Sequence, residues 1–555
     1  MQNRQLVVLT SLITRLVISA STCTFFQPDE FYQSLEVAHY YTFGYGKLTW
    51  EWLSPKPIRS IIYPALNVPL YTLLKYLHLD DTELLIIAPK ILHGILASGT
   101  DIALFDLTLK ILGADYAPVA TFVSLTSFFH GLALSRTLSN SLETTVTIIA
   151  LSNYPWDTST LIWRNDLRKF LFFAGLACAI RVTSAVVWVF LFFLLLWRMR
   201  TNQTKIVAAI TDAVSLGLTV LSLQCIMDSL YYGRATLTPL NFLVTNLSSV
   251  SLFYGSSPWH YYLTQGIPIL TVFSLPFVLH GAWLAYNQPG HSPLKDILGL
   301  VIWTVGIYSL AGHKEWRFIH PLLPLLHIFA AKSLVDLYRA QHRPTDKAQS
   351  DRHSWLKIRS SYLWLHLVHI PLVLYMIRFH GRAQVEVMRY LRTEVDIRSA
   401  GFLMPCHSTP WQSHLHRPEL ADAGRLWALG CEPPLQILIL PSGENLTEYQ
   451  DQTDIFYQSP IAYILNHFPA VVDPSFPPSP YPASVPGNAE QSGAWQHTWP
   501  QYLIMFGALL REPGITDVVL ALGYKRVWHR EMGWEGDERR QGGVIVWKHF
   551  GNFSR

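Results

Sequence analysis

The segment FQPDEF at residues 26–31 follows one apolar run, residues 6–25. About 20 mostly apolar residues are enough to cross a lipid bilayer, so the run predicts a first membrane span. Because it contains Arg15 and no clear cleavage site, we expect the span to be retained. The adjacent carboxylates Asp29 and Glu30 directly follow the membrane exit. Ionisable groups this close to a bilayer are costly and indicate a functional site.

The composition of the chain also indicates a membrane protein. Of its 555 residues, 50% are hydrophobic and 14% are charged, whereas about a quarter of the residues of a soluble protein are charged. The net charge of +4 is too small to predict nucleic-acid binding. The five cysteines form no C-x-x-C metal motif. Cys406 and Cys431 share a polar region and could form a disulfide if that region lies in an oxidising compartment.

The later apolar segments bring the predicted total to about eleven spans. Residues 170–197 could form one helix with a buried Arg181 or two short helices that meet there. The positive-inside rule places the basic clusters at residues 164–169, 198–205 and 339–357 in the cytosol. This favours two helices with Arg181 at a lumenal turn, a cytosolic N-terminus and a lumenal C-terminus. The predicted spans after the first are 84–110, 116–134, 142–158, 170–180, 183–197, 206–230, 268–286, 294–311, 318–338 and 361–379.

The chain is expected to divide into a transmembrane domain, residues 1–379, and a C-terminal lumenal domain, residues 380–555. A large first lumenal loop, residues 26–83, contains a proline-interrupted apolar stretch at 61–79 that suits an interfacial helix better than a span. The sequence thus predicts an α-helical polytopic membrane protein with a mixed α/β C-terminal lobe. The elements predicted in the lobe are strands at residues 435–440, 518–522 and 543–547 and a helix at residues 499–510.

The first lumenal loop holds the main candidates for a site. Adjacent residues do not share a face of a helix, so only one of Asp29 and Glu30 is expected to point into a site. The plainer alternative is a solvated turn in which Glu30 caps the next helix. Further along, Trp50 or Trp52 could anchor the protein at the membrane interface, and Arg59 could bind a phosphate or lipid headgroups. The candidates for an acceptor pocket are Gln33, Trp50, Glu51 and Arg59.

A second cluster, GHKEWRF at residues 312–318, places four ionisable groups in a short connection between two predicted spans. Lys314 and Arg317 fit a phosphate held at the bilayer surface, and His313 could donate to the same phosphate. The alternative is a turn whose cations only extend to lipid headgroups. Two short turns on the same side of the membrane contribute Arg136 and Arg181.

Asp29 in the first loop, together with the cluster at residues 312–318, resembles the dolichol-phosphate-mannose-dependent mannosyltransferases of glycosyltransferase family 22, which have the GT-C fold. Motifs in the lobe resemble those of the GPI-anchor enzymes that add the third mannose more than those of the N-glycan enzymes. Val182 follows Arg181 where many relatives have proline. The motifs are FQPDEFYQSLE (26–36), FGYGKLTWEW (43–52), SRTLSNSLE (135–143), DSLYYG (228–233), HKEWRFI (313–319), MPCHSTPW (404–411) and CEPP (431–434).

The resemblance implies a multi-pass enzyme of the endoplasmic reticulum that needs no metal or other cofactor. Its donor would be dolichol phosphate mannose, its acceptor the dimannosyl GPI glycolipid precursor, and the new linkage α-1,2. The alternative within the family is a mannosyltransferase of the N-glycan lipid-linked oligosaccharide. His407, His414 and His416 have no tight ligand spacing, so no metal site is predicted.

A β-linked donor and an α-linked product imply a single displacement with inversion. Asp29 is then expected to be the base for the acceptor hydroxyl, and Glu30 to orient Asp29 or the acceptor. A transporter would instead show matching broken helices in two halves, which the sequence lacks, and a non-catalytic subunit would not need both clusters. The groups expected to neutralise the leaving phosphate are His313, Lys314 and Arg317, assisted by Arg181 and Arg136.

Overall fold

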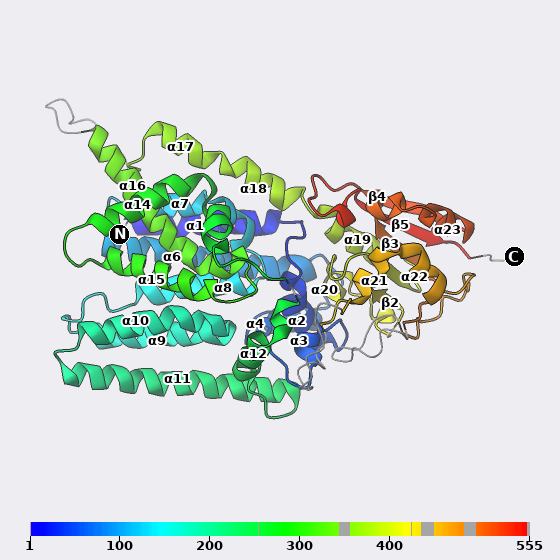
Figure 1. Ribbon diagram of the computed structural model, residues 1–555, viewed down its shortest axis with the longest axis horizontal. Helices are drawn as coiled ribbons and strands as arrows, with labels where there is room; N and C mark the ends of the chain where they lie inside the picture. Colours follow the sequence, from blue (N-terminus) through cyan, green and yellow to red (C-terminus); the bar gives the residue numbers. More distant parts are fainter. Residues whose placement is uncertain are drawn as a thin grey trace.

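The computed structural model describes residues 2–253, 255–342, 356–422, 424–433, 449–481 and 495–551. A bundle of helices occupies one end of the molecule, a lobe built on a β-sheet occupies the other, and the helices of the first loop lie between them (Figure 1). The helices of the bundle are α1 (Gln2–Ser21), α6 (Leu84–Ile111), α7 (Ala117–Leu125), α8 (Ser139–Ser152), α9 (Trp163–Ile180), α10 (Ala185–Arg198), α11 (Gln203–Tyr232), α13 (Ile267–Thr271), α14 (Leu275–Asn287), α15 (Pro293–Ser309), α16 (Leu323–Gln341), α17 (Ser360–Leu367) and α18 (His369–Arg378).

The bundle has the helices of a multi-pass membrane protein. Every predicted span falls on a helical segment, and six of the predicted spans lie in helices that are long and apolar enough to cross a membrane. The other five form shorter or interrupted helices. Within the described residues, the six long segments are Arg4–Ser21, Leu84–Ile111, Gln203–Tyr232, Tyr262–Asn287, Trp316–Gln341 and Ser360–Thr393.

The predicted break at Arg181 is confirmed. α9 ends at Ile180 and α10 begins at Ala185, so residues 170–197 form two helices. Arg181 has an extended backbone between them, with φ −145° and ψ 115°. An extended residue interrupts the helical hydrogen-bond ladder, which lets the chain turn here although Val182 is no proline.

The first loop folds into four short helices: α2 (Glu36–Phe43), α3 (Trp50–Leu53), α4 (Ile62–Ala65) and α5 (Val68–Tyr76). The apolar stretch at residues 61–79 forms α4 and α5, and each is too short to cross a bilayer. α5 buries Tyr71 and exposes Tyr76. Helices with one buried and one exposed apolar face suit a membrane surface, as the prolines in this stretch predict.

A buried ion pair joins the first two long helices of the bundle. Arg15 on α1 binds both carboxylate oxygens of Asp101 on α6, each at 2.8 Å, and both side chains have 0% exposure. The Ser124 hydroxyl donates to the same carboxylate at 2.7 Å. The guanidinium also donates to the carbonyl oxygens of Ser124 and His130, each at 3.2 Å. The charge inside the first apolar run is thus fully paired, as buried charges must be.

The lobe contains one mixed sheet in the order β2-β1-β3-β5-β4. β1 is parallel to β2 and β3, whereas β5 is antiparallel to β3 and β4. The strands are β1 (Ala400–Leu403), β2 (Leu426–Ala428), β3 (Tyr502–Phe506), β4 (Tyr524–Arg530) and β5 (Val544–His549), and the helices of this region are α19 (Arg382–Thr393), α20 (Gln412–Leu415), α21 (Gln452–Gln458), α22 (Pro460–His467) and α23 (Ile515–Ala521).

Two predictions for elements of the lobe were wrong. The predicted helix at 499–510 contains β3, the central strand, whose five residues are all buried. A strand covered on both faces has a continuous apolar sequence that periodicity cannot distinguish from a buried helix. The predicted strand at 518–522 belongs to α23, which buries Ile515 and Val519 four residues apart. The predicted strand at 543–547 is confirmed as β5, and residues 435–440 lie outside the described residues.

A disulfide joins Cys406 and Cys431, with their Cα atoms 5.9 Å apart. The two cysteines follow β1 and β2, which are parallel neighbours in the sheet. Parallel strands bring their carboxyl ends to the same edge, so this pairing staples the two loops there. The disulfide that the sequence left open is therefore present.

The lobe contacts the first loop through a buried carboxylate. Glu36 on α2 has 0% exposure and accepts hydrogen bonds from the backbone N–H groups of Trp411, at 3.2 Å, and Ser413, at 2.7 Å. Burial raises the pKa of Glu36 to about 7, because the loss of water outweighs these hydrogen bonds. The folded state thus binds a proton at a pH where the unfolded state has lost it.

Glu36→Gln is expected to make the folded protein less sensitive to pH. The ordinary pKa of a glutamate, 4.5, applies to Glu36 in the unfolded chain. Protonation of Glu36 therefore stabilises the fold fully below pH 4.5, and this contribution is lost as the pH rises through about 7. The melting temperature of wild type relative to Glu36→Gln should therefore fall between pH 5 and pH 8. Thermal unfolding of the purified proteins tests this, with the exposed Glu419→Gln as control. A pH-independent difference would contradict it.

Candidate active site

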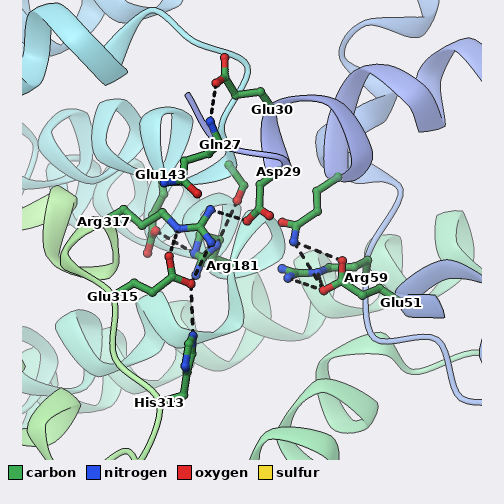
Figure 2. Close-up of polar contacts among 12 residues, drawn as sticks. Gln27, Asp29, Glu30, Glu51, Arg59, Glu143, Arg181, His313, Glu315 and Arg317 are labelled. Atoms are coloured by element: carbon green, nitrogen blue, oxygen red, sulfur yellow. Dashed lines mark hydrogen bonds and ion pairs between the residues drawn. The ribbon is translucent and has the colours of Figure 1, made fainter. Parts of the chain in front are cut away.

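Asp29 and the GHKEWRF connection meet in one cluster of polar side chains (Figure 2). Asp29 lies in the turn between α1 and the short π-helix Phe31–Leu35, and Arg317 lies in the 3₁₀ helix Trp316–Leu322 before α16. Arg317 Nη1 donates to Asp29 Oδ2 at 2.5 Å, although the residues are 288 positions apart. The two clusters that the sequence singled out therefore converge.

Arg317 is itself held by a second carboxylate. Its Nε donates to Glu315 Oε2 at 2.5 Å, and its Nη2 donates to Glu315 Oε1 at 2.9 Å. This paired contact fixes the plane of the guanidinium and leaves Nη1 for Asp29. Asp29 is thus positioned through one oxygen, and its Oδ1 accepts no hydrogen bond from any described residue. The side chain of Asp29 is 18% exposed.

His313 extends the same chain of contacts. Its Nε2 lies 3.2 Å from Glu315 Oε1. This hydrogen bond raises the pKa of His313 above its ordinary value, against the opposing effect of burial. Burial alone would raise the pKa of Glu315, but Arg317 and His313 together hold that pKa well below its usual range. The connection therefore keeps an ionised carboxylate beneath Arg317.

Lys314 does not join this cluster. Its Nζ donates to the carbonyl oxygen of Ser257 at 2.8 Å, and the residue is buried. Neighbouring residues in a tight connection point in different directions, so Lys314 and Arg317 leave the chain on different sides. Lys314 here anchors the connection to the loop of residues 255–260, which precedes the π-helix Tyr262–Gly266.

Glu30 points away from Asp29, as Figure 2 shows. Its Oε1 accepts hydrogen bonds from the backbone N–H groups of Phe26, at 3.2 Å, and Gln27, at 3.0 Å. Arg136 binds its Oε2 at 3.1 Å. The residue is buried, so it does not form the solvated turn of the plainer alternative. Glu30 and Arg136 hold the FQPDEF segment in shape instead of meeting the Asp29 cluster.

Three acceptor-pocket candidates form a polar chain, and Figure 2 shows two of them, Glu51 and Arg59, beside Asp29. Gln33 Nε2 donates to Glu51 Oε2 at 3.2 Å, and Arg59 binds Glu51 Oε1 through Nη2 at 2.7 Å and Nε at 2.9 Å. Trp50 belongs instead to a small apolar cluster with Ile58. Gln33, Glu51 and Arg59 thus form one polar chain, whereas Trp50 packs against apolar residues.

A pocket beside this chain is lined by two arginines. Arg181 Nη1 donates to Ser139 Oγ at 3.0 Å, and Arg181 Nε lies 3.2 Å from Glu143 Oε2. Arg59 lines the same pocket from the first loop, and Phe242 of α12 (Thr238–Leu247) closes one side. Two guanidinium groups that line one pocket suit a substrate that carries a phosphate.

Sequence reasoning missed the carboxylate that pairs with Arg181, which is Glu143. The pattern of the GHKEWRF connection did suggest that Glu315 could orient Arg317, and the two residues form an ion pair. Asp228 accepts hydrogen bonds from Ser60 Oγ, at 2.9 Å, and Ile61 N, at 3.0 Å, which fixes the backbone just after Arg59. The indication of Asp228 in the sequence was that a single acidic residue lies near the end of the long apolar segment 206–230.

A metal site is not supported by the residues that could form one. Among the described residues, Cys406, His407 and Cys431 are the one group of potential ligands whose atoms lie close together. Their two sulfurs are joined in the disulfide and so cannot act as thiolate ligands. His414 and His416 do not belong to this group.

Comparison with known proteins agrees with the fold. The crystal structure of ArnT from Cupriavidus metallidurans bound to undecaprenyl phosphate matches with a TM-score of 0.55 at 12% identity, over 98% of this chain and 97% of that chain. ArnT is a GT-C protein, so the match shows that fold.

Curated relatives cover most of the chain. "GPI mannosyltransferase 3" of Yarrowia lipolytica is 35% identical over 96% of this chain and 95% of its own length. "GPI alpha-1,2-mannosyltransferase 3" of Mus musculus is 34% identical over 83% of this chain and 78% of its own length. The family model described as "Alg9-like mannosyltransferase family" matches residues 6–416, which include Asp29, Arg181 and Arg317. The chain belongs to the Alg9-like mannosyltransferase family.

Proposed function

We propose that this chain transfers mannose from dolichol phosphate mannose to the second mannose of the GPI-anchor precursor, in α-1,2 linkage. The contact between Asp29 and Arg317 supports this most directly, because it positions a carboxylate beside two arginines that line one pocket. Relatives named for the third GPI mannose and for α-1,2 transfer supply the acceptor and the linkage.

The reaction is a single inverting displacement. Asp29 Oδ1 accepts the proton from the 2-hydroxyl of the acceptor mannose as that oxygen attacks the anomeric carbon of the donor. The bond from the anomeric carbon to the phosphate oxygen breaks, and dolichyl phosphate leaves with the electron pair. Arg317 orients Asp29, while Arg181 and Arg59 stabilise the charge that develops on the phosphate. The step needs no metal or organic cofactor.

In this proposal the enzyme is an endoplasmic-reticulum membrane protein with a lumenal site. The membrane domain comprises residues 1–379 in about eleven spans, and the lumenal lobe comprises residues 380–555. The lobe covers the acceptor side of the site, since α20 packs against the first loop through Glu36. The disulfide between Cys406 and Cys431 agrees with an oxidising lumen.

Lipid analysis of cells that lack this chain tests the acceptor. The proposal expects the dimannosyl GPI precursor to accumulate and the dolichol-linked oligosaccharide to be of normal length. Re-expression of wild type should clear the intermediate, and re-expression of a folded Asp29→Asn protein should not. Accumulation of a truncated dolichol-linked oligosaccharide with normal GPI lipids would favour the N-glycan alternative.

Arg181→Ala is expected to weaken use of the donor. The loss of one charge-assisted contact to phosphate costs about 1.5–3 kcal/mol, which lowers kcat/KM for dolichol phosphate mannose by about 10- to 100-fold. Initial rates at varied donor concentration measure this. Arg164→Ala removes an exposed arginine that pairs with Asp212 elsewhere on the bundle and should leave kcat/KM unchanged. Equal kinetics for the two variants would remove Arg181 from the phosphate site.

A further inference from the structure

A second pocket lies on the Glu30 side of the FQPDEF segment, between the bundle and the lobe. Its walls come from the end of α1, the start of α6, the turn before α8 and the lobe. Glu30, Lys90, Ser135 and Arg136 line it, whereas Asp29 does not. We call it the junction pocket.

The junction pocket lies where lipid headgroups lie. α1 ends at Ser21 and α6 begins at Leu84, and both helices are long and apolar enough to span a membrane. Thr22 directly follows α1, Lys90 is the seventh residue of α6, and both line the pocket. The ends of membrane spans coincide with the polar surface of the bilayer. A lipid headgroup can therefore reach the pocket from the membrane.

The lining of the junction pocket carries an excess of positive charge. Arg136 pairs with Glu30 at 3.1 Å, and Glu30 also accepts two backbone N–H groups. Lys90 forms no ion pair with any described carboxylate, and its Nζ donates to the carbonyl oxygen of Thr22 at 2.8 Å. Two cations thus share one carboxylate. A cation held away from bulk water without a counter-charge is costly, and a bound anion removes that cost.

Hydrogen-bond donors of three kinds remain for such an anion. Ser135 Oγ is buried and has no hydrogen-bond partner among the described residues. Lys90 uses one of its three N–H groups, for Thr22. Arg136 donates through Nε to Leu132 O and through Nη2 to Thr24 Oγ1, each at 2.8 Å, which leaves one N–H on Nη2. An ammonium, a hydroxyl and a guanidinium around one space suit the several oxygens of a phosphate group.

We propose that the junction pocket binds a phosphate group carried by a membrane lipid. Lys90 supplies the charge, and Ser135 and Arg136 supply directed hydrogen bonds. The phosphate belongs either to the glycolipid acceptor or to an ordinary phospholipid. The site is separate from the Asp29 cluster, so the proposal stands or falls independently of the mannose transfer.

The test measures phosphate-dependent lipid binding by the full chain purified in a maltoside detergent, which has no phosphate. The probe is dioctanoyl phosphatidate, and dioctanoylglycerol is the matched lipid without phosphate. Binding is read by affinity titration and by the rate of thiol labelling at Cys23, which lines the pocket. Cys178→Ser and Cys225→Ser remove the other free thiols. Phosphatidate should slow Cys23 labelling, and dioctanoylglycerol should not.

Variants on α6 supply the matched comparison. Lys90→Met should weaken phosphatidate binding by about 10- to 100-fold, as expected for a lost charge-assisted hydrogen bond, and Lys90→Arg should retain it. Lys110 lies on the same helix, binds a backbone carbonyl oxygen of Ser152, and lines neither pocket, so Lys110→Met should bind as wild type. If Lys90→Met does not fold, Ser135→Ala takes its place and should bind several-fold more weakly.

Either of two results would overturn the proposal: equal affinity for wild type and the Lys90 or Ser135 variant, or no protection of Cys23 by phosphatidate. Competition then identifies the source of the phosphate. The glycolipid acceptor displaces phosphatidate at micromolar concentration if the pocket holds the acceptor. Phosphatidylinositol displaces it and the acceptor does not if the pocket holds a bulk phospholipid. Displacement by inorganic phosphate alone, with no effect of either lipid, would overturn the assignment to a lipid.

Discussion

Asp29→Asn is expected to lower kcat for mannose transfer by about 10²–10⁴-fold, the contribution of a positioned base. The substitution keeps the shape of the side chain and an oxygen that can accept the Arg317 hydrogen bond, which measures 2.5 Å in the wild type. It removes only the capacity to take a proton. The binding of both substrates should therefore change far less than turnover. Transfer of labelled mannose in microsomes, with separate kcat and KM values, measures the effect.

Asp115→Asn provides the control for this experiment. Asp115 follows α6 at the end of the bundle away from the site, where it pairs with Arg339 and Lys357. This variant should transfer mannose at the wild-type rate. A folded Asp29→Asn protein with near-normal turnover would remove Asp29 as the base, and a proportionate loss of Asp29→Asn protein from the membrane would show a folding defect instead.

Asp101→Ala is expected to destabilise the protein by about 3–5 kcal/mol, because it leaves a buried arginine without its partner. Arg15 and Asp101 both have 0% exposure and lie between α1 and α6. These are the helices whose ends frame the FQPDEF segment. The expected result is a lower melting temperature in detergent and less folded protein in the membrane, with retained activity in the fraction that folds.

A control variant and a compensating double variant can both be made on the same two helices. Arg4 and Asp106 form an exposed pair there at 2.9 Å, and Asp106→Ala should cost less than about 1 kcal/mol. The double variant Arg15→Met, Asp101→Leu removes both buried charges and should recover most of the lost stability. A melting temperature for Asp101→Ala equal to that of Asp106→Ala would show that the buried pair does not stabilise the bundle.

The local sequence pattern was sufficient to predict most of the helices of the membrane domain. Apolar length depends on the sequence alone, so the predicted spans fall on helices, and six of them reach spanning length. The break at Arg181 followed from the placement of basic residues. Asp29 and the GHKEWRF connection stood out because ionised groups beside a bilayer are costly. Their meeting was expected from the resemblance, and the contact between Asp29 and Arg317 confirms it.

The direction of individual side chains was not accessible in the same way. Lys314 and Arg317 are three positions apart, yet Lys314 binds Ser257 O and Arg317 binds Asp29. Glu30 and Asp29 are adjacent, yet Glu30 binds Arg136 and Asp29 binds Arg317. Each choice depends on a partner that is distant along the chain, such as Arg136, which is 106 positions from Glu30. A local pattern carries no information on such partners.

The amino-acid sequence by itself determined the helices of the bundle, the break between α9 and α10, and the two acidic and basic clusters of the site, because these depend on composition and local spacing. Only the tertiary structure decided which cations face Asp29, which carboxylates hold them, and that the run at 499–510 is a central strand. The reason is physical: burial on both faces removes the periodicity that distinguishes strand from helix, and an ion pair forms between residues that packing brings together, whatever their separation along the chain.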